Sequence, residues 1–381
     1  MPTYVTEEKK QQWTAALTTL SQESLEFAPD FPRIAQRHEA FWAHQCLDRP
    51  LLLSWMNTKP ERPTSKHLEV IREPDRWLAE KYADMCQTQW IGDSIPHIRV
   101  DFGPVIMTML AGLEPQFVSD TTWYHPIIHD DWSNAPDWTF DDNSTWMQLL
   151  LELLHLTAVD AAGRYAVCTP NLGGTDEVLL NYRGSGNLCM DVIDQPERII
   201  EAVQAIHPGW EKMTALLYDT ILEHDAPLIQ WQHLWSNQPY TLPSSDFNAL
   251  IGPRDFQKLF MFDIERRAKT VGRASFHLDG PDAARHIDTL LDCEALDVIQ
   301  FTPGDGKASA RTYGEMFRKV QSRGKSCLIA CGKDDVFPLC DVLQPEGLAF
   351  LMFDAFSPEE HLAFYNEFCR YFHTQSSLEE I

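Results

Sequence analysis

Short apolar segments alternate with longer amphipathic segments along most of the chain. Helical spacing places the apolar residues of each longer segment on one stripe, as with Ala283, Ile287 and Leu290. Such alternation is typical of parallel βαβ units, and about eight apolar segments predict a (β/α)8 TIM barrel of the α/β class. The predicted strands are 51–56, 98–104 with its exit turn, 165–170, 227–231, 273–278, 296–301, 327–331 and 348–353.

No glycine-rich phosphate-binding loop follows any of these strands. Gly-x-Gly-x-x-Gly and Gly-x-x-x-x-Gly-Lys-Ser/Thr are both absent from the sequence, whereas nucleotide-binding sheets depend on such loops. The pattern thus favours a barrel over a doubly wound nucleotide-binding sheet.

We expect the chain to fold as one domain, residues 1–381. Two segments of it do not show the alternation of strands and helices. Residues 1–48 are a predicted N-terminal helical extension, in which Trp13 and Leu17 recur at helical spacing. Residues 115–142 are rich in Trp, His, Asp and Pro and have no clear period. We interpret this second segment as an irregular, lid-like insertion that covers a pocket.

The stretch from Arg273 to Pro281 is predicted to be a buried strand that leads directly into a helix. Gly280 permits a sharp turn, and Pro281 suits the first helical position. Residues two apart in a strand share a face, so His277 and Asp279 lie together at the carboxyl end of the strand, where α/β folds bind ligands. A simpler interpretation makes Asp279 a helix cap and His277 a hydrogen-bonded core residue.

Charge and cysteine content narrow the classes of partner and compartment. The chain has 31 Lys and Arg against 56 Asp and Glu, a net charge of −25, and so acidic a surface repels nucleic acid and anionic membranes. The nine cysteines include no Cys-x-x-Cys pair, which argues against a disulfide framework. The sequence shows no signal-peptide pattern and no apolar run of membrane-spanning length. We expect a cytoplasmic protein.

Three groups of residues form a pattern of strand ends and turns that extends over about residues 34–372. They are RHEAFW (37–42) with DRP (48–50), PNLGG (170–174) with RG (183–184) and DVIDQPE (191–197), and FHLDGP (276–281) with LDVIQ (296–300). Together they resemble the uroporphyrinogen decarboxylase-like superfamily. The resemblance implies a TIM barrel, and the superfamily contains both porphyrinogen decarboxylases and cobalamin- or corrinoid-linked methyltransferases.

The chain departs from the true decarboxylases of that superfamily. Those enzymes carry an Arg-Gln-Ala-Gly-Arg motif after the first strand, which binds the carboxylates of the substrate. Residues 54–58 here read Ser-Trp-Met-Asn-Thr, without an arginine. A substrate with many carboxylates would be held poorly, so the resemblance favours the corrinoid-linked methyltransferase branch.

The zinc-dependent methyltransferases of the superfamily use a His-x-Cys pair and a distant Cys. In this chain Asp279 follows His277 in the place of the first Cys, and Cys331 lies at a later strand end. Because carboxylate oxygen is an accepted zinc ligand, the resemblance suggests His277, Asp279 and Cys331 as a zinc site. The alternative is that Cys331 is an ordinary buried residue.

A pocket at the carboxyl ends of the strands would have a polar mouth with aromatic walls. His277 and Asp279 are predicted to be a general acid/base pair, with Asp246 as a second catalytic carboxylate whose simpler role is a turn cap. The predicted substrate-binding residues are Trp55, Asp101, Asn171, Trp231, His233 and Gln300. For Asn171 and His233, a purely structural role is the simpler alternative.

The pattern and the resemblance predict a methyltransferase-like enzyme that moves a methyl group from a small methylated substrate to a corrinoid or thiol. The chain has no Asp-x-His-x-x-Gly cobalamin-binding motif, so a partner protein would supply the corrinoid. The alternative enzyme is a metal-independent lyase or decarboxylase acting on a small organic acid or sugar derivative. A third alternative is a non-catalytic binding protein on the same fold. The resemblance also suggests a homodimer.

Overall fold

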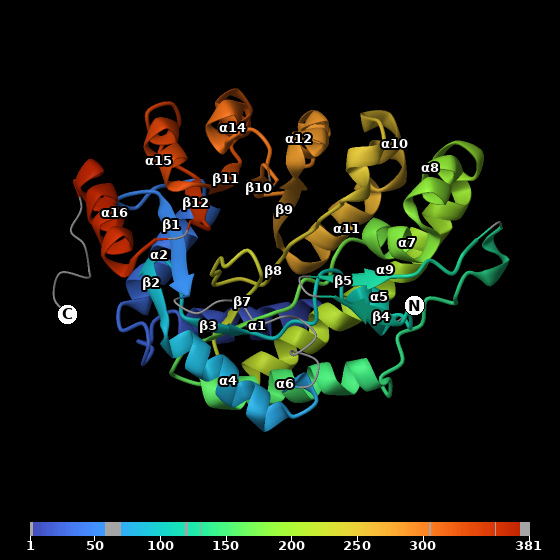
Figure 1. Cartoon of the computed structure of the whole chain (residues 1–381), viewed down its shortest axis with the longest axis horizontal. Coiled ribbons are helices and arrows are strands. Elements are labelled where there is room, and N and C mark those ends of the chain that lie inside the picture. The colour runs from blue at the N-terminus through green and yellow to red at the C-terminus, as the bar shows by residue number, and fades with distance from the viewer. Residues whose placement is uncertain are drawn as a thin grey trace.

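The computed structural model describes residues 3–57, 70–118, 121–129, 131–304, 306–354 and 356–373. The strands form a curved central layer, and helices lie around its outside (Figure 1). Segments far apart in the sequence meet in this layer. The first strand, β1 (Leu51–Asn57), pairs in parallel with the last, β12 (Leu348–Met352), and both lie on the same side of the molecule.

Two main sheets make up the central layer. The smaller sheet is wholly parallel and has the order β3 (His97–Arg99), β6 (Ala166–Cys168) and β7 (Leu228–Ile229). Within the larger sheet all neighbours are parallel except β1 and β2. Its order is β2 (Thr88–Gly92), β1, β12, β11 (Ser326–Cys331), β10 (Val298–Thr302), β9 (Arg273–Asp279) and β8 (Tyr240–Thr241).

The α/β class with a central parallel sheet is therefore confirmed. The complete eight-stranded barrel stays a prediction, because no backbone pairing within the described ranges joins β3 to β1 or β7 to β8. The antiparallel strand β2 was not predicted. It is a short return after a helix, and its residues 88–90 carry no alternating apolar pattern that would mark it in the sequence.

Helices follow most of the strands. They are α1 (Glu7–Leu20), α2 (Phe31–Trp42), α4 (Pro74–Cys86), α5 (Met107–Leu110), α6 (Thr145–Ala161), α7 (Thr175–Arg183), α8 (Ser185–Asp194), α9 (Pro196–Leu222), α10 (Pro253–Leu259), α11 (Met261–Val271), α12 (Gly280–Ala283), α13 (Ile287–Leu291), α14 (Gly314–Ser322), α15 (Lys333–Cys340) and α16 (Pro358–Tyr371). Of these helices, α5 and α8 were not predicted from the sequence. Phe260 separates α10 from α11, because it leaves helical geometry and packs its ring against Phe247 at 5.8 Å between centroids.

The two faces of the larger sheet have different neighbours, because side chains alternate along each strand. His277 on β9 pairs with Gln300 on β10, which pairs with Leu328 on β11, so these three lie on one face. Phe276 and Ile299 occupy the other face and belong to the core that the strands share with the surrounding helices. The register therefore determines which polar side chains leave the helix-packed core.

The N-terminal extension is attached to the strands by a buried ion-pair network. Asp93 accepts hydrogen bonds from Arg49 Nη1 at 2.5 Å and from the backbone N of Leu52 at 3.0 Å, and it lies 3.3 Å from Arg37 Nη1. Burial acts to raise the pKa of Asp93, but the charges of Arg49 and Arg37 lower it overall. These contacts give the segments 37–42 and 48–50 a structural role.

The predicted lid at 115–142 contains ordered structure. Strands β4 (Pro115–Phe117) and β5 (Thr122–Tyr124) form an antiparallel pair. The chain after them is attached to α7, because the backbone N atoms of Ile127 and Ile128 both donate to Tyr182 O at 3.0 Å. That this segment covers a pocket stays a prediction.

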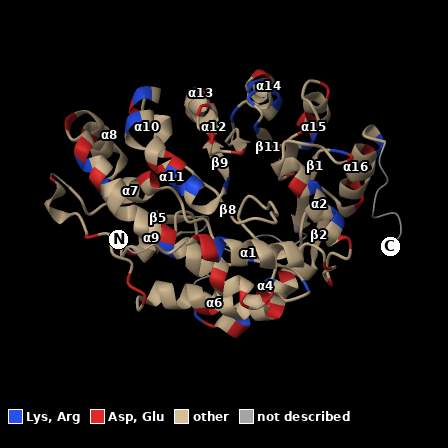
Figure 2. Cartoon of the chain, turned by 180° about the vertical axis from the view of Figure 1, so that it is seen from behind, with Lys and Arg blue, Asp and Glu red and all other residues tan. Residues whose placement is uncertain are grey.

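Charged side chains are spread over the outer helices, where Figure 2 shows them on α4, α6, α10, α11 and α14. Among the described residues, none of the helices combines the length and the apolar character that crossing a membrane requires.

Candidate active site

Three predicted catalytic side chains converge at the carboxyl end of β9. Asp246, His277 and Asp279 each offer a metal-binding or proton-transferring atom, and these atoms all lie within 4.8 Å of one another. His277 and Asp279 share a face of the strand, as their spacing predicted. Asp246 reaches them because the segment before it runs beside β9, where His277 N donates to Pro243 O at 2.9 Å. We call these three residues the acidic cluster.

The imidazole of His277 is held by two neighbours. Its Nδ1 donates a hydrogen bond to Gln300 Oε1, and Gln300 Nε2 donates to Thr302 Oγ1 at 2.9 Å. Because an amide oxygen only accepts, Nδ1 carries a proton, and neutral His277 has its lone pair on Nε2. The ring of Trp231 packs edge-on against the imidazole at 4.9 Å between centroids. Nε2 is thus the nitrogen available as a base or ligand.

Neither aspartate of the acidic cluster caps a helix. Asp246 precedes the 3-10 helix η2 (Phe247–Leu250) and Asp279 precedes α12, yet neither side chain makes a capping hydrogen bond. The capping interpretation of both residues is wrong. Both aspartates are exposed, whereas His277 is half-buried, so a ligand can reach the two carboxylates from solvent.

Two further carboxylates from the first turn of α7 lie beside Asp246. Glu177 accepts hydrogen bonds from Gly174 N at 2.8 Å and from Asp246 N at 3.2 Å. Asp176 accepts one from Ser245 Oγ at 2.6 Å. The loop that carries Asp246 is thereby fixed against the start of α7, and the charges of Glu177, Asp279 and Asp176 all act on Asp246.

The proximity of these carboxylates raises the pKa values of Asp246 and Asp176. The charge of Glu177, then burial and the charges of Asp279 and Asp176, raise the pKa of Asp246 to about 8. Burial and the charge of Glu177 raise the pKa of Asp176 to about 7. A carboxyl group with a pKa in this range retains its proton near neutral pH and can donate it. Asp246 combines this raised pKa with exposure to solvent, which suits a general acid.

The acidic cluster also fits a divalent cation. One imidazole nitrogen and two carboxylate oxygens are an acceptable donor set for zinc. Oxygen donors are harder than thiolates, so the set is less suited to thiol activation than a cysteine-rich site. Metal binding requires Asp246 to lose its proton. Proton donation and metal binding by Asp246 are therefore mutually exclusive.

The predicted grouping of Cys331 with His277 and Asp279 needs correction, because among the described residues the structure groups Asp246 with them instead. His277 is in register with Leu328, and Cys331 lies three positions further along β11, on the opposite face. It belongs to the core shared with the helices. Burial, with the charges of Asp335 and Asp354, raises the pKa of its thiol well above the usual value. Cys331 fits the simpler interpretation of a buried apolar residue.

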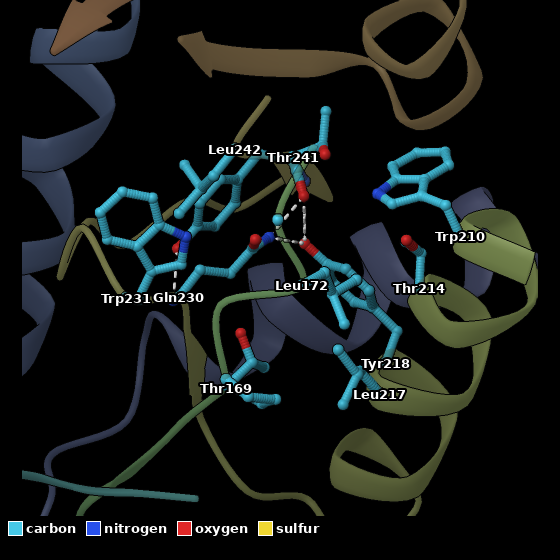
Figure 3. A pocket seen from close by; sticks show the side chains of 13 residues that line it. Thr169, Leu172, Trp210, Thr214, Leu217, Tyr218, Gln230, Trp231, Thr241 and Leu242 are labelled. Atoms are coloured by element: carbon cyan, nitrogen blue, oxygen red, sulfur yellow. Dashed lines mark hydrogen bonds between the residues drawn. The ribbon is translucent and has the colours of Figure 1, made fainter. Parts of the chain in front are cut away.

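A small cavity adjoins the acidic cluster through Trp231. Figure 3 shows its lining, with Gln230 directed toward Tyr218, and Gln230 Nε2 donates to the Tyr218 hydroxyl at 3.2 Å. Thr169 and Leu172 also line the cavity. The volume of the cavity is about 20 Å3. This is enough for a water molecule and too small for a substrate.

The predicted substrate-binding residues divide into separate groups. Gln300 and Trp231 contact His277, as described above. Trp55 and His233 contact each other instead, with ring centroids 4.2 Å apart, and His233 also packs on His97 at 4.8 Å. The substrate-binding role of all these residues stays a prediction.

Asp101 and Asn171 make local contacts that support the chain. Asp101 forms an ion pair with Arg99 at 2.7 Å and accepts a hydrogen bond from Gly103 N at 3.2 Å. Asn171 Oδ1 accepts one from Gly173 N at 2.9 Å. For Asn171 this turn-forming bond matches the structural alternative.

Sequence reasoning did not select Asp176, Glu177, His97 or Cys168 as site residues. The acidic pair had a usable signal, because it begins a helix directly after a Gly-Gly turn at a strand end, where ligands bind in α/β folds. His97 and Cys168 had none, since each is a single residue in a short apolar strand.

Comparisons with known proteins add a likeness in fold. No protein-family model matches the sequence, and no curated protein matches it. Among solved structures, the chain is similar to a methyltransferase from Methanosarcina mazei, with a TM-score of 0.58, over 90% of this chain and 99% of that chain. The two sequences are 11% identical. At that identity the likeness concerns the fold alone, and this chain shares the α/β fold of that methyltransferase.

Proposed function

We propose that this protein is an enzyme that transfers a methyl group from a small methylated substrate to a corrinoid or thiol acceptor. The observation that carries the proposal is the convergence of Asp246, His277 and Asp279 at one strand end. The raised pKa of Asp246 supports it. The fold shared with a methyltransferase supports it.

Under this proposal the scaffold is a (β/α)8 barrel of the uroporphyrinogen decarboxylase-like superfamily. Its support is the pairing of the first strand with the last, together with the sequential order of parallel strands from β9 to β12. In such a barrel the acidic cluster would lie at the carboxyl-terminal face, where barrel enzymes carry their active sites.

Loss of a methyl group from oxygen, nitrogen or sulfur leaves an electron pair on the atom that carried it. A proton delivered to that atom makes it a better leaving group. Asp246 would donate this proton, while His277 Nε2 and Asp279 would hold the polar end of the substrate. Gln300 would keep the imidazole in the required tautomer. The external acceptor takes the methyl group, and a partner protein would present a corrinoid.

Zinc would be held by His277, Asp279 and ionised Asp246. When bound, it would supply a Lewis acid that polarises the leaving atom or stabilises a thiolate. Elemental analysis of protein purified without added metal distinguishes the two forms of the proposal. About one zinc per chain in the wild type, lost in His277→Ala, would show that metal assistance takes the place of proton donation by Asp246.

A lyase or decarboxylase without metal is the second candidate. The specific observation in its favour is the same proton on Asp246, because a carbanion left by carbon dioxide loss needs a proton donor nearby. The substrate would be a small organic acid or sugar derivative.

The test offers the purified protein free cob(I)alamin together with methanol, methylamines or methylated thiols, and follows methylcobalamin by absorbance. We expect turnover with at least one donor, and a loss of about 100-fold or more in Asp246→Asn and His277→Ala. Asp282→Asn is the matched control, because this exposed carboxylate lies on α12 outside the acidic cluster.

Other outcomes would replace the proposal. Carbon dioxide release or solvent deuterium incorporation without methyl transfer would establish the lyase. Ligand binding without turnover, unchanged in His277→Ala, would indicate a binding protein.

A further inference from the structure

The structure contains a second group of side chains that could bind a metal, and this group shares no residue with the acidic cluster. His97, Cys168 and His233 each offer a ligand atom, and these three atoms lie within 4.8 Å of one another. They come from the start of β3, the end of β6 and the loop after β7. Two imidazoles and a thiol from three separate segments converge, so the tertiary structure alone creates this group.

The hydrogen bonds of His97 leave one nitrogen available. Its Nδ1 donates to Ile95 O at 2.8 Å, and since a carbonyl oxygen only accepts, neutral His97 has its lone pair on Nε2. A backbone carbonyl that binds one ring nitrogen and thereby orients the other is the usual arrangement behind a metal-binding histidine.

His233 is nearly inaccessible and incompletely bonded. The residue is 7% exposed, and its buried Nδ1 has no hydrogen-bond partner among the described residues. Buried polar atoms are ordinarily paired, so an orphan nitrogen needs an explanation. The backbone at His233 has φ +60°, a left-handed conformation that non-glycine residues seldom adopt. A bond from His233 N to Gln230 O at 2.7 Å maintains this turn, and the turn places the imidazole against His97.

Cys168 completes the group with a fully buried thiol whose contact is a weak one, Sγ to Thr169 O at 3.7 Å. Arg99 and Asp101, whose charges both act on Cys168, form an ion pair with each other at 2.7 Å. The carboxylate of Asp101 therefore balances the positive charge of Arg99, which would otherwise repel a cation. Two imidazoles and one thiol are left as possible ligands.

Aromatic packing explains part of this arrangement but not all of it. The Trp55 and Trp90 rings lie against His233 and His97, at 4.2 Å and 4.9 Å between centroids. Stacking accounts for ring planes. Stacking does not account for the unpaired Nδ1 of His233 or for a thiol within 4.8 Å of a nitrogen on each imidazole.

We infer that His97, Cys168 and His233 bind a soft divalent transition metal of the zinc class, as two nitrogen ligands and one thiolate. Three protein ligands leave a fourth position for water or a substrate atom, the arrangement found in catalytic zinc sites. Metal binding requires neutral imidazoles and a thiolate, so it releases the proton of the Cys168 thiol.

Cobalt(II) is the probe that tests this site, because a bound thiolate gives it a charge-transfer band in the near ultraviolet. The full-length protein is dialysed against a chelator and titrated with cobalt(II). We expect about one equivalent to produce the band, with the band absent in Cys168→Ser and binding weakened about tenfold or more in His233→Asn and His97→Gln. Asparagine is chosen at residue 233 because it tolerates positive φ.

Two control variants separate this site from the others. Cys331→Ser removes a different buried thiol, and Asp279→Asn removes a ligand of the acidic cluster; both should retain the band. Circular dichroism confirms that each variant is folded. A folded wild-type protein that gives no thiolate band, or a band that persists in Cys168→Ser, would overturn the inference. Because the readout is spectroscopic, its failure is distinguishable from failure of the proposed methyl transfer.

Discussion

Gln300 and His277 occupy paired positions on adjacent parallel strands, and the amide oxygen of Gln300 accepts the Nδ1 proton of the imidazole. The other end of the amide donates to Thr302 Oγ1 at 2.9 Å, so the side chain of Gln300 is held at both ends of its amide. The strand register thus determines which imidazole nitrogen is available for chemistry.

Replacing Gln300 should reduce turnover without removing a group that reacts. Gln300→Leu deletes the acceptor for Nδ1, and loss of such an orienting partner costs about 10–100-fold in activity or metal affinity. Gln300→Glu retains an oxygen acceptor and should recover most of the rate. The measurement is kcat for both variants in the methyl-transfer assay. Equal rates for Gln300→Leu and wild type would show that the tautomer of His277 is unimportant.

The pH dependence of the rate should report the proton on Asp246. This carboxyl group is protonated below its pKa of about 8 and ionised above it. A reaction that uses the proton should have a kcat that falls about tenfold per pH unit on the alkaline side. Asp246→Asn should be slow and should lack this alkaline limb. An alkaline limb that survives in Asp246→Asn would assign the proton to another group.

Stability should also respond to the raised pKa values. Because Asp176 and Asp246 bind protons more tightly when folded, with pKa values of about 7 and 8, these two groups hold more protons in the native state than in the unfolded chain between about pH 4 and 8. Their contribution to the free energy of unfolding should therefore decrease as pH rises through this range. Urea denaturation at several pH values measures the slope of the free energy of unfolding against pH, which should become more positive in Asp246→Asn. A slope unchanged by that substitution would contradict the assignment.

The ion pair between Arg49 and Asp93 should be essential for stability. Both side chains are fully buried and their closest atoms are 2.5 Å apart, so Asp93→Asn leaves a buried guanidinium without its counter-charge. We expect a loss of about 3–5 kcal/mol in the free energy of unfolding. The pKa of Asp93 is lowered in the native state, so its contribution is present above the unfolded pKa and is lost as pH falls below it.

Asp48→Asn is the control for this pair. Asp48 pairs with Arg37 at 2.9 Å, but 21% of its side chain is exposed, and a partly exposed ion pair contributes about 0–1 kcal/mol. Chemical denaturation of both variants gives the comparison. Similar losses for Asp48→Asn and Asp93→Asn would show that burial does not set the strength of these pairs.

Cys331→Ala should leave metal content and turnover unchanged. The residue faces the core between strands and helices, 8% exposed, and its truncation should cost about 1 kcal/mol of stability. Elemental analysis beside His277→Ala is the measurement. Loss of metal from both variants would show that Cys331 is a metal ligand, against its position on the opposite face of the sheet.

The sequence alone determined the order of eight of the strands, without β2, β4, β5 and β8, and the shared face of His277 and Asp279. These features depend on hydrophobic periodicity and on the two-residue alternation of a strand, which are local properties. The strand predicted at 273–278 is observed at Arg273–Asp279, and that at 327–331 at Ser326–Cys331. The helix breaks, such as the one at Phe260, follow from tertiary packing and could not be predicted in this way.

The tertiary structure decided which residues from different segments meet. It placed Asp246 in the acidic cluster and Cys331 on the opposite face, because inter-strand register is set by packing across the whole sheet. It also brought Glu177 to Asp246, and His97 to Cys168 and His233. Contacts between residues far apart in the sequence leave no periodic signal, so the chemistry of both sites became visible only in the folded chain.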